Sequence, residues 1–195
     1  MDDRLKKQID FILEIDKEKN IFRQTSLTNH GRKENDAEHA WHMAVMAWLL
    51  SEYSNEKIDV GKVMLMCLVH DIVEIDAGDT YAYDEEGKKT QGEREEVAAD
   101  RIFGILPSDQ GKKLRSIFEE FEKNETSDAR FAHAMDNFQP LLLNNSNDGN
   151  DWKEHGIRAE QVVKRQERCK GASDVIFAKI MDIIDSNLKA GNLRD

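Results

Sequence analysis

The stretch Cys67–Asp79, CLVHDIVEIDAGD, decides the fold, because it places a histidine and four carboxylates on and just after a helix that is otherwise apolar. Its apolar residues continue a stripe that starts at Val60 and keeps the spacing of one helix face up to Ile75. Asp59 is a typical N-cap for such a helix, and Gly78 is of the type that commonly ends one. We therefore expect a core helix that carries ionisable side chains into the interior.

Helical periodicity extends over almost the whole chain. The predicted helices begin at or just after residues 2, 35, 59, 92, 107, 127, 151 and 173. Asn35 and Glu38 form a capping box, Asp151 and Ser173 also start helices, and Pro140 is expected to kink or end the helix that Ser127 caps. No segment alternates convincingly as a strand, and residues 80–90 have the character of a loop. The predicted fold class is all-α, in a single domain over residues 1–195.

The composition excludes several classes of protein. The formal net charge of −11 disfavours non-specific binding to nucleic acid polymers and to anionic membranes. No apolar run reaches the ~18 residues of a membrane span, and MDDRLKKQID lacks the pattern of a signal peptide. Cys67 and Cys169 form no close-spaced metal or redox motif, so we expect reduced thiols and a cytoplasmic protein without a membrane partner.

Four ionisable residues at apolar helix positions predict a metal site. His70 and Asp71 are neighbours on the core helix, while His39 and Asp136 lie amid apolar residues of two other predicted helices. A buried ionised carboxylate needs a cation or a donor nearby, and a metal would compensate all four groups. Two imidazoles and two carboxylates suit one divalent cation of the Mn, Co, Fe, Ni or Zn type, or Mg, with positions left open for water and substrate. We expect this catalytic metal in the core cleft of a helical bundle.

The same residues resemble a known family. The pattern H…HD…D, with each residue on a helix, resembles the HD-domain metal-dependent phosphohydrolases, and within them the 5′-deoxynucleotidases of HD type. The resemblance rests on three segments, GRKENDAEHAWHMA, HDIVEIDAGD and FAHAMDNFQPLL. It implies a single HD domain with a metal-site core at about residues 20–145, followed by C-terminal helices at 151–191. It also implies hydrolysis of nucleoside 5′-monophosphates to nucleoside and phosphate.

The resemblance assigns a role to several residues. It makes His39, His70, Asp71 and Asp136 the metal ligands. Glu74 would be the acid/base group for the attacking water, and Asp79 would line the site and help to bind substrate. Glu74 and Asp79 are similar to a second, Mg-type site in some members. Arg23 falls where the family grips the 5′-phosphate, which suits the fork of a guanidinium, and Arg32 is the alternative clamp.

The sequence departs from the family pattern at two positions. Gln24 stands where bacterial members often have a tryptophan that helps to exclude a ribose 2′-hydroxyl, so the sugar preference stays open. Pro140 interrupts a helix that is usually continuous. Trp41 and Trp48 have core spacing, and the family suggests a homodimer, for which Ile176 and Phe177 on the last helix would serve.

Three classes of function remain open. The first is the 5′-nucleotidase. The second is another HD-domain phosphohydrolase or phosphodiesterase that acts on cyclic, bis- or triphosphorylated nucleotides. The third is a metal-stabilised binding or regulatory module, against which Glu74 argues, because a purely structural metal would not need it.

Overall fold

The computed structural model describes residues 2–195 and confirms the all-α class. The α-helices are α1 (Asp3–Ile15), α2 (Asp36–Leu50), α3 (Val60–Val69), α4 (Glu74–Ala77), α5 (Lys88–Phe103), α6 (Ser108–Lys123), α7 (Ser127–Ser146), α8 (Asn150–Glu154), α9 (Ala159–Gln166) and α10 (Asp174–Lys189). Short 3-10 helices are η1 (Asp16–Asn20), η2 (Ser51–Tyr53) and η3 (Glu167–Cys169). A two-stranded ribbon is formed by β1 (Phe22–Ser26) and β2 (Lys33–Asn35).

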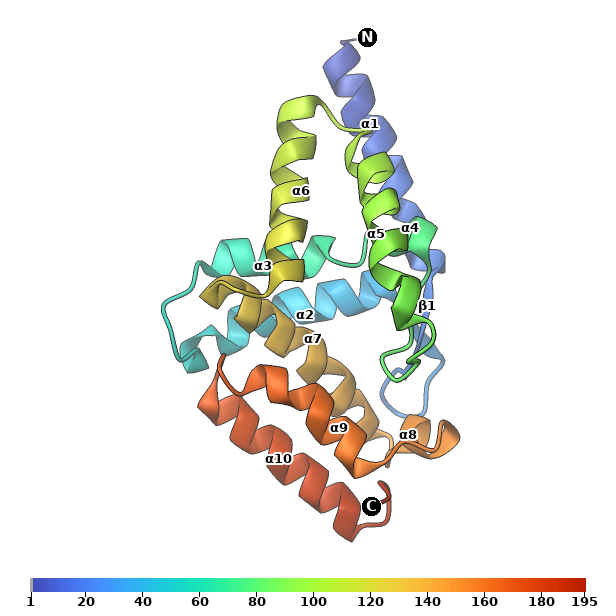
Figure 1. Cartoon of the computed structure of the whole chain (residues 1–195), viewed down its shortest axis with the longest axis vertical. Helices are drawn as coiled ribbons and strands as arrows, with labels where there is room; N and C mark the ends of the chain where they lie inside the picture. Colours follow the sequence, from blue (N-terminus) through green and yellow to red (C-terminus); the bar gives the residue numbers. More distant parts are fainter. Residues whose placement is uncertain (1) are drawn as a thin grey trace.

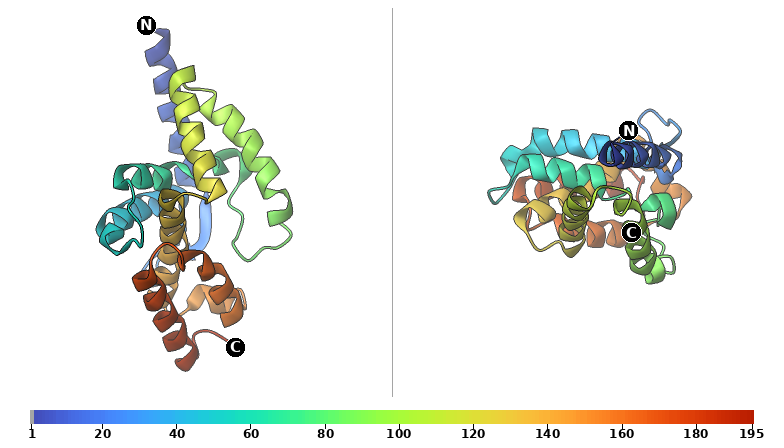
Figure 2. Two further views of the ribbon diagram at one scale, coloured as in Figure 1. Left: turned by 60° about the vertical axis from the view of Figure 1, so that its left-hand side comes forward. Right: turned by 90° about the horizontal axis from the view of Figure 1, so that it is seen from above.

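The helices are arranged in three tiers (Figure 1). The helices α1, α5 and α6 stand at one end, α2 and α3 cross the middle, and α8, α9 and α10 lie at the other end, as the turned views also show (Figure 2). Helix α7 runs from the middle tier to the last one and packs on α2 and α3. Met43, Met66, Phe131 and Met135 are fully buried between these three helices. The central tier is therefore a rigid apolar platform.

Three predicted helix starts are confirmed by their caps. The Asn35 side chain accepts a hydrogen bond from the backbone N–H of Glu38 at 2.9 Å, and the Glu38 carboxylate accepts one from the N–H of Asn35 at 3.2 Å. The side chains of Asp59 and Ser173 cap α3 and α10 in the same way. These contacts satisfy N–H groups that the first turn leaves without a partner.

The predicted core helix is interrupted where its ionisable residues begin. Helix α3 ends at Val69, and the chain turns before the short helix α4. In this turn the N–H of Glu74 donates to the carbonyl of Asp71, three residues back, at 2.9 Å, so the backbone is wound more tightly than an α-helix. Gly78 then ends α4 with a φ of +76°, in the left-handed region that favours glycine.

Other sequence-based expectations were wrong. Pro140 does not end α7, which continues to Ser146, although the proline has no N–H to give to the carbonyl of Asp136 one turn before it. The helix expected at 151–169 is divided into α8, α9 and η3, and α5 starts at Lys88 rather than at Gly92. The antiparallel ribbon β1–β2 was not predicted, because strands of five and three residues are too short to show alternation.

The surface also differs from the prediction. Trp41 and Trp48 are 64% and 62% exposed, so they are not core residues. Ile176 is buried, and Phe177 is partly buried against the core. The homodimer stays a prediction, but it cannot use those two C-terminal residues as exposed contacts. No helix within residues 2–195 is both long enough and apolar enough to span a bilayer.

The cap of α7 is Thr126 rather than the predicted Ser127. The Thr126 hydroxyl accepts from the N–H of Ala129 at 3.1 Å, whereas the Ser127 hydroxyl donates to the carbonyl of Lys57 at 3.3 Å. We expect Thr126→Ala to lower the free energy of unfolding by about 1 kcal/mol, because the capping bond is lost. Ser127→Ala is the matched control and should change it by less than about 0.5 kcal/mol. Urea unfolding of both variants measures the difference, and equal losses would contradict the assignment.

Candidate metal centre

The structure brings the four predicted metal-binding residues together. His39 comes from α2, His70 and Asp71 from the end of α3, and Asp136 from the middle of α7. His39 Nε2 lies 3.2 Å from Asp136 Oδ1 and 3.9 Å from Asp71 Oδ2, and His70 Nε2 lies 3.0 Å from Asp71 Oδ1. One ligand atom each from His39, His70 and Asp136 lies within 4.8 Å of the others. The four groups therefore face a common centre, which we call the histidine cluster.

Hydrogen bonds orient both imidazoles so that Nε2 of each can bind a cation. A carbonyl can only accept, so His70 Nδ1 carries the proton that it shares with the carbonyl of Cys67 at 3.0 Å. The other nitrogen, His70 Nε2, is buried and has no well-aligned hydrogen bond among the described residues, although Asp71 Oδ1 lies 3.0 Å away. His39, which is fully buried, pairs its Nδ1 with Gln139 Oε1 at 3.0 Å, and this likewise leaves Nε2 toward the centre. The histidine cluster thus offers lone pairs that a divalent cation would satisfy.

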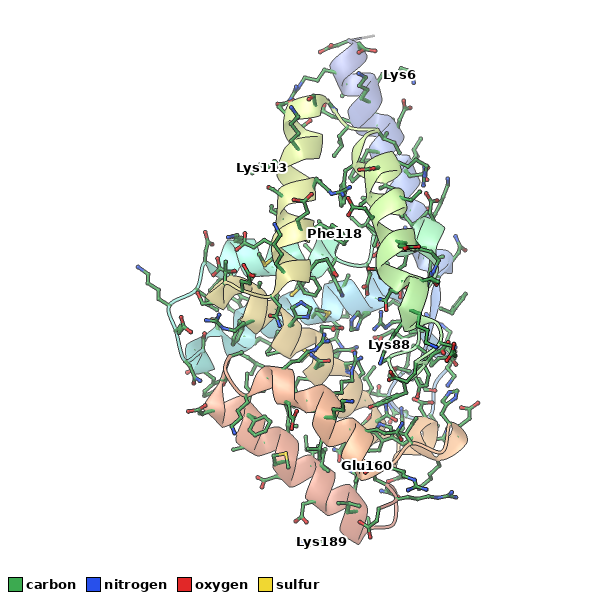
Figure 3. All side chains as sticks on the ribbon, viewed as in Figure 1. Lys6, Lys88, Lys113, Phe118, Glu160 and Lys189 are labelled. Carbon is green, nitrogen blue, oxygen red and sulfur yellow. The ribbon has the colours of Figure 1, made fainter. Side chains whose placement is uncertain are left out.

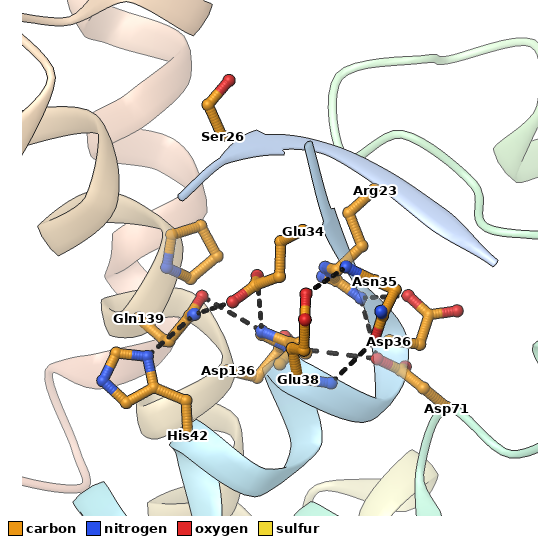
Figure 4. A network of polar contacts seen from close by, with 12 residues as sticks. Arg23, Ser26, Glu34, Asn35, Asp36, Glu38, His42, Asp71, Asp136 and Gln139 are labelled. Atoms are coloured by element: carbon orange, nitrogen blue, oxygen red, sulfur yellow. Dashed lines mark hydrogen bonds and ion pairs between the residues drawn. The ribbon is translucent and has the colours of Figure 1, made fainter. Parts of the chain in front are cut away.

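Gln139 and Glu34 form a supporting network that the sequence did not reveal (Figure 4). The amide nitrogen of Gln139 donates to Glu34 Oε1 at 2.7 Å and lies 3.1 Å from His42 Nδ1. This contact turns the amide oxygen of Gln139 toward His39. Both Gln139 and Glu34 are almost completely buried. On the sequence, Gln139 is one turn from Asp136 but otherwise resembles any helical glutamine.

A second group of carboxylates lies beside the histidine cluster. Asp36, Glu74 and Asp79 each offer one oxygen within 4.8 Å of the others, and we call them the carboxylate cluster. Glu74 and Asp79 were the predicted second, Mg-type site, and the structure adds Asp36. Three converging carboxylates are typical ligands of a hard cation such as Mg²⁺. Asp36 escaped prediction because an acidic residue in the first turn of a helix is common for reasons of the helix dipole alone.

Burial and like charges perturb the protonation of these groups. Burial, helped by the charges of Asp71 and Asp36, raises the pKa of Glu74 well above its usual range. Burial and Asp71 raise the pKa of Asp36 to about 7. Burial opposes ionisation of Asp71 as well, but His70 and Arg23 beside it hold its pKa below the usual range. Carboxyl groups whose pKa values are pushed apart in this way are suited to proton transfer near neutral pH.

Arg23 joins the two clusters. Its Nη1 donates to Asp71 Oδ2 at 2.8 Å and lies 3.2 Å from Asp36 Oδ1, and only 12% of its side chain is exposed (Figure 4). It lines the site, as expected, but these contacts are to carboxylates of the protein. Arg32, the predicted alternative clamp, is not brought to the site: it is exposed and pairs with Glu38.

Both clusters open into one cavity of about 830 Å³. Its lining includes Arg23 and Gln24 of β1, Asp79, and residues of the following loop and of α9, among them Tyr81 and Arg165. This volume lies within the range of sites for small molecules, roughly 300–1,000 Å³. The arrangement can hold one or two divalent cations next to a small polar substrate.

An all-α fold with this buried His/Asp site is that of a metal-dependent hydrolase. The comparisons agree, because the family model described as HD domain matches residues 15–176. The chain belongs to the HD domain family and is an HD-domain metal-dependent phosphohydrolase. The roles of individual residues stay predictions, and the geometry described above is consistent with them.

Three known proteins show the range of similarity. A crystal structure of a predicted metal-dependent phosphohydrolase from Magnetospirillum magnetotacticum is 47% identical, with a TM-score of 0.95 over 98% of this chain and 96% of that one. The 5′-deoxynucleotidase HDDC2 of Homo sapiens is 31% identical over 114 residues, which are 58% of this chain and 54% of that protein. The match thus spans about half the length of this relative. An HD-domain phosphohydrolase from Listeria innocua, 16% identical with a TM-score of 0.58 over 92% of this chain and 85% of that one, shares the fold.

The network behind His39 leads to a test. We expect Gln139→Leu to weaken Mn²⁺ binding by roughly 10- to 100-fold, because the imidazole loses the partner that fixes its tautomer and orientation. Gln166→Leu is the matched control, since Gln166 is equally buried but donates to the carbonyl of Asn137 at 2.8 Å instead. Titration calorimetry of both variants measures the affinities. Unchanged Mn²⁺ binding by Gln139→Leu would show that the network does not support the site.

Proposed function

We propose that this chain removes phosphate from nucleoside 5′-monophosphates and acts as a 5′-deoxynucleotidase-like phosphomonoesterase. The observation that carries the proposal is the opening of the histidine and carboxylate clusters into one cavity of about 830 Å³. The name of the human relative, at 31% identity, supports the choice of substrate class. The partner is then a small nucleotide, and neither a nucleic acid polymer nor a membrane is needed.

The histidine cluster would hold the metal through His39, His70, Asp71 and Asp136. A divalent cation bound there supplies Lewis acidity, which polarises the phosphorus–oxygen bond and acidifies water. The mixed nitrogen and oxygen ligands suit Mn, Co, Fe, Ni or Zn, and Mg less well. The carboxylate cluster would hold a second, Mg-type ion through Glu74, Asp79 and Asp36.

Glu74 would handle the proton of the attacking water. It is buried, its Oε2 has no hydrogen-bond partner among residues 2–195, and it belongs to the carboxylate cluster. Water attacks phosphorus in line, and Glu74 accepts the proton that the water loses. The bond from phosphorus to the nucleoside 5′-oxygen breaks, and this oxygen takes a proton from solvent or from an acid in the pocket. Asp79, which is partly buried and lines the cavity, would orient the substrate.

Nucleotide hydrolysis tests the substrate class. With Mn²⁺ or Co²⁺, we expect phosphate release from dAMP, dCMP or dUMP and little from cyclic, bis- or triphosphorylated nucleotides. Products from the latter group alone would replace the proposal with another HD-domain activity. No hydrolysis of any of these substrates, with metal tightly bound, would indicate a binding module.

Variants at the site separate metal binding from chemistry. We expect Glu74→Gln to keep Mn²⁺ and to lose roughly 10²–10⁴-fold in kcat, because the amide cannot accept the proton. Asp71→Ala should lose Mn²⁺ and turnover together. Glu160→Gln on the exposed surface of α9 is the control and should match the wild type (Figure 3). Full activity of Glu74→Gln would disprove its role as the base.

A further inference from the structure

Arg165 is a cation at the cavity that no motif pointed to. It lies on α9 and lines the same cavity as both clusters. Its Nη2 is 3.8 Å from Asp136 Oδ2, too far for a hydrogen bond, and 23% of its side chain is exposed. Within residues 2–195, the guanidinium of Arg165 donates no hydrogen bond, and its one ion pair is the contact with Asp136. Its donors therefore face the cavity without a strong acceptor.

Four other cations among the described residues line the cavity, namely Arg23, Lys88, Lys164 and Arg168. Lys164 and Arg168 are exposed, whereas Arg165 is partly buried and has Nη2 3.8 Å from Asp136 Oδ2. Arg23 already shares its Nη1 between Asp71 and Asp36. Lys88, which also lines the cavity, pairs with Glu85 at 3.0 Å (Figure 3). A phosphate that enters the cavity would have to break the contacts of Arg23, whereas Arg165 can turn toward it at little cost.

The charge of Arg165 acts on both clusters. It helps to hold the pKa of Asp136 below its usual range, and it opposes the burial that raises the pKa of Asp79. It also opposes the rise that burial causes in the pKa of the Tyr81 hydroxyl. The ring of Tyr81 lies next to that of Tyr83, with a centroid distance of 5.4 Å. The charge of Arg165 thus reaches groups of both clusters, and Arg165 lines the same cavity as Tyr81 and Tyr83.

We propose that Arg165 binds the phosphate group of the substrate. This inference rests on the proposed function, since it assumes a phosphomonoester in the cavity. A guanidinium binds two phosphate oxygens with two parallel N–H donors, which a lysine cannot do. When a cation compensates the charge of Asp136, the attraction between Asp136 and Arg165 weakens, and the guanidinium becomes available to the phosphate. The assignment makes α9 part of the substrate site.

Binding of inorganic phosphate to the Mn²⁺-loaded protein tests the proposal. We expect Arg165→Gln to weaken phosphate binding by roughly 10- to 100-fold in titration calorimetry, as for the loss of a charged hydrogen bond. Arg165→Lys should recover part of the affinity, because it restores the charge without the fork. Arg4→Gln removes an exposed arginine that pairs with Asp109 outside the cavity, and this variant should bind phosphate like the wild type.

Mn²⁺ binding to the same variants separates this role from support of the metal. Loss of a positive charge near Asp136 should leave Mn²⁺ affinity unchanged or higher. Wild-type phosphate affinity in Arg165→Gln would overturn the proposal, and so would loss of Mn²⁺ from this variant, since Arg165 would then act through Asp136. Absence of phosphate binding by the wild type would also overturn it. If phosphate binding depends on Arg165 while monophosphates are not hydrolysed, the inference stands and only the proposed substrate fails.

Discussion

The central constraint on this structure is the concentration of buried carboxylates around one buried arginine. Asp36, Asp71, Glu74 and Asp136 crowd between α2, α3 and α7, and Arg23 is the only guanidinium hydrogen-bonded to any of them within residues 2–195. Even with Arg165 at 3.8 Å from Asp136, the arginines do not balance so many carboxylates in a poorly hydrated interior. The pKa values diverge as a consequence, with Asp36 and Glu74 raised and Asp71 lowered. A divalent cation relieves this imbalance.

The apolar platform makes such crowding tolerable. Met43, Met66 and Met135 are fully buried and lock the three helices that bear the ligands. Close-packed interiors leave side chains little room to move, so the polar groups cannot separate to reduce their repulsion. This packing restrains the ligand positions, so little of the binding free energy of a cation would be needed to assemble the site. The fold contributes to the chemistry mainly by holding repelling groups together.

The sequence predicted the parts of the site that rest on local patterns. Helix caps such as Asn35 and an apolar stripe with embedded His70 and Asp71 are visible in a window of a few residues. Asp36 and Gln139 were missed, because their roles depend on which helices meet in space. The role of Arg32 in phosphate binding was overestimated. Arg32 is close to His39 in the sequence, but its side chain does not line the cavity. The ribbon β1–β2, which positions Arg23, is too short for its periodicity to be recognised.

Different segments of the cavity wall carry the groups for the reaction and the groups that would recognise the substrate. The groups suited to phosphate chemistry come from the central helices and the turn between α3 and α4. The walls that would meet the sugar and base come from other segments: Gln24 on β1, Tyr81 in the loop after Asp79, and Trp152 on α8. These segments are joined to the platform by loops, so they can differ between proteins without moving the metal-binding groups. The substrate preference of this chain should therefore be sought in the walls, and the type of reaction in the platform.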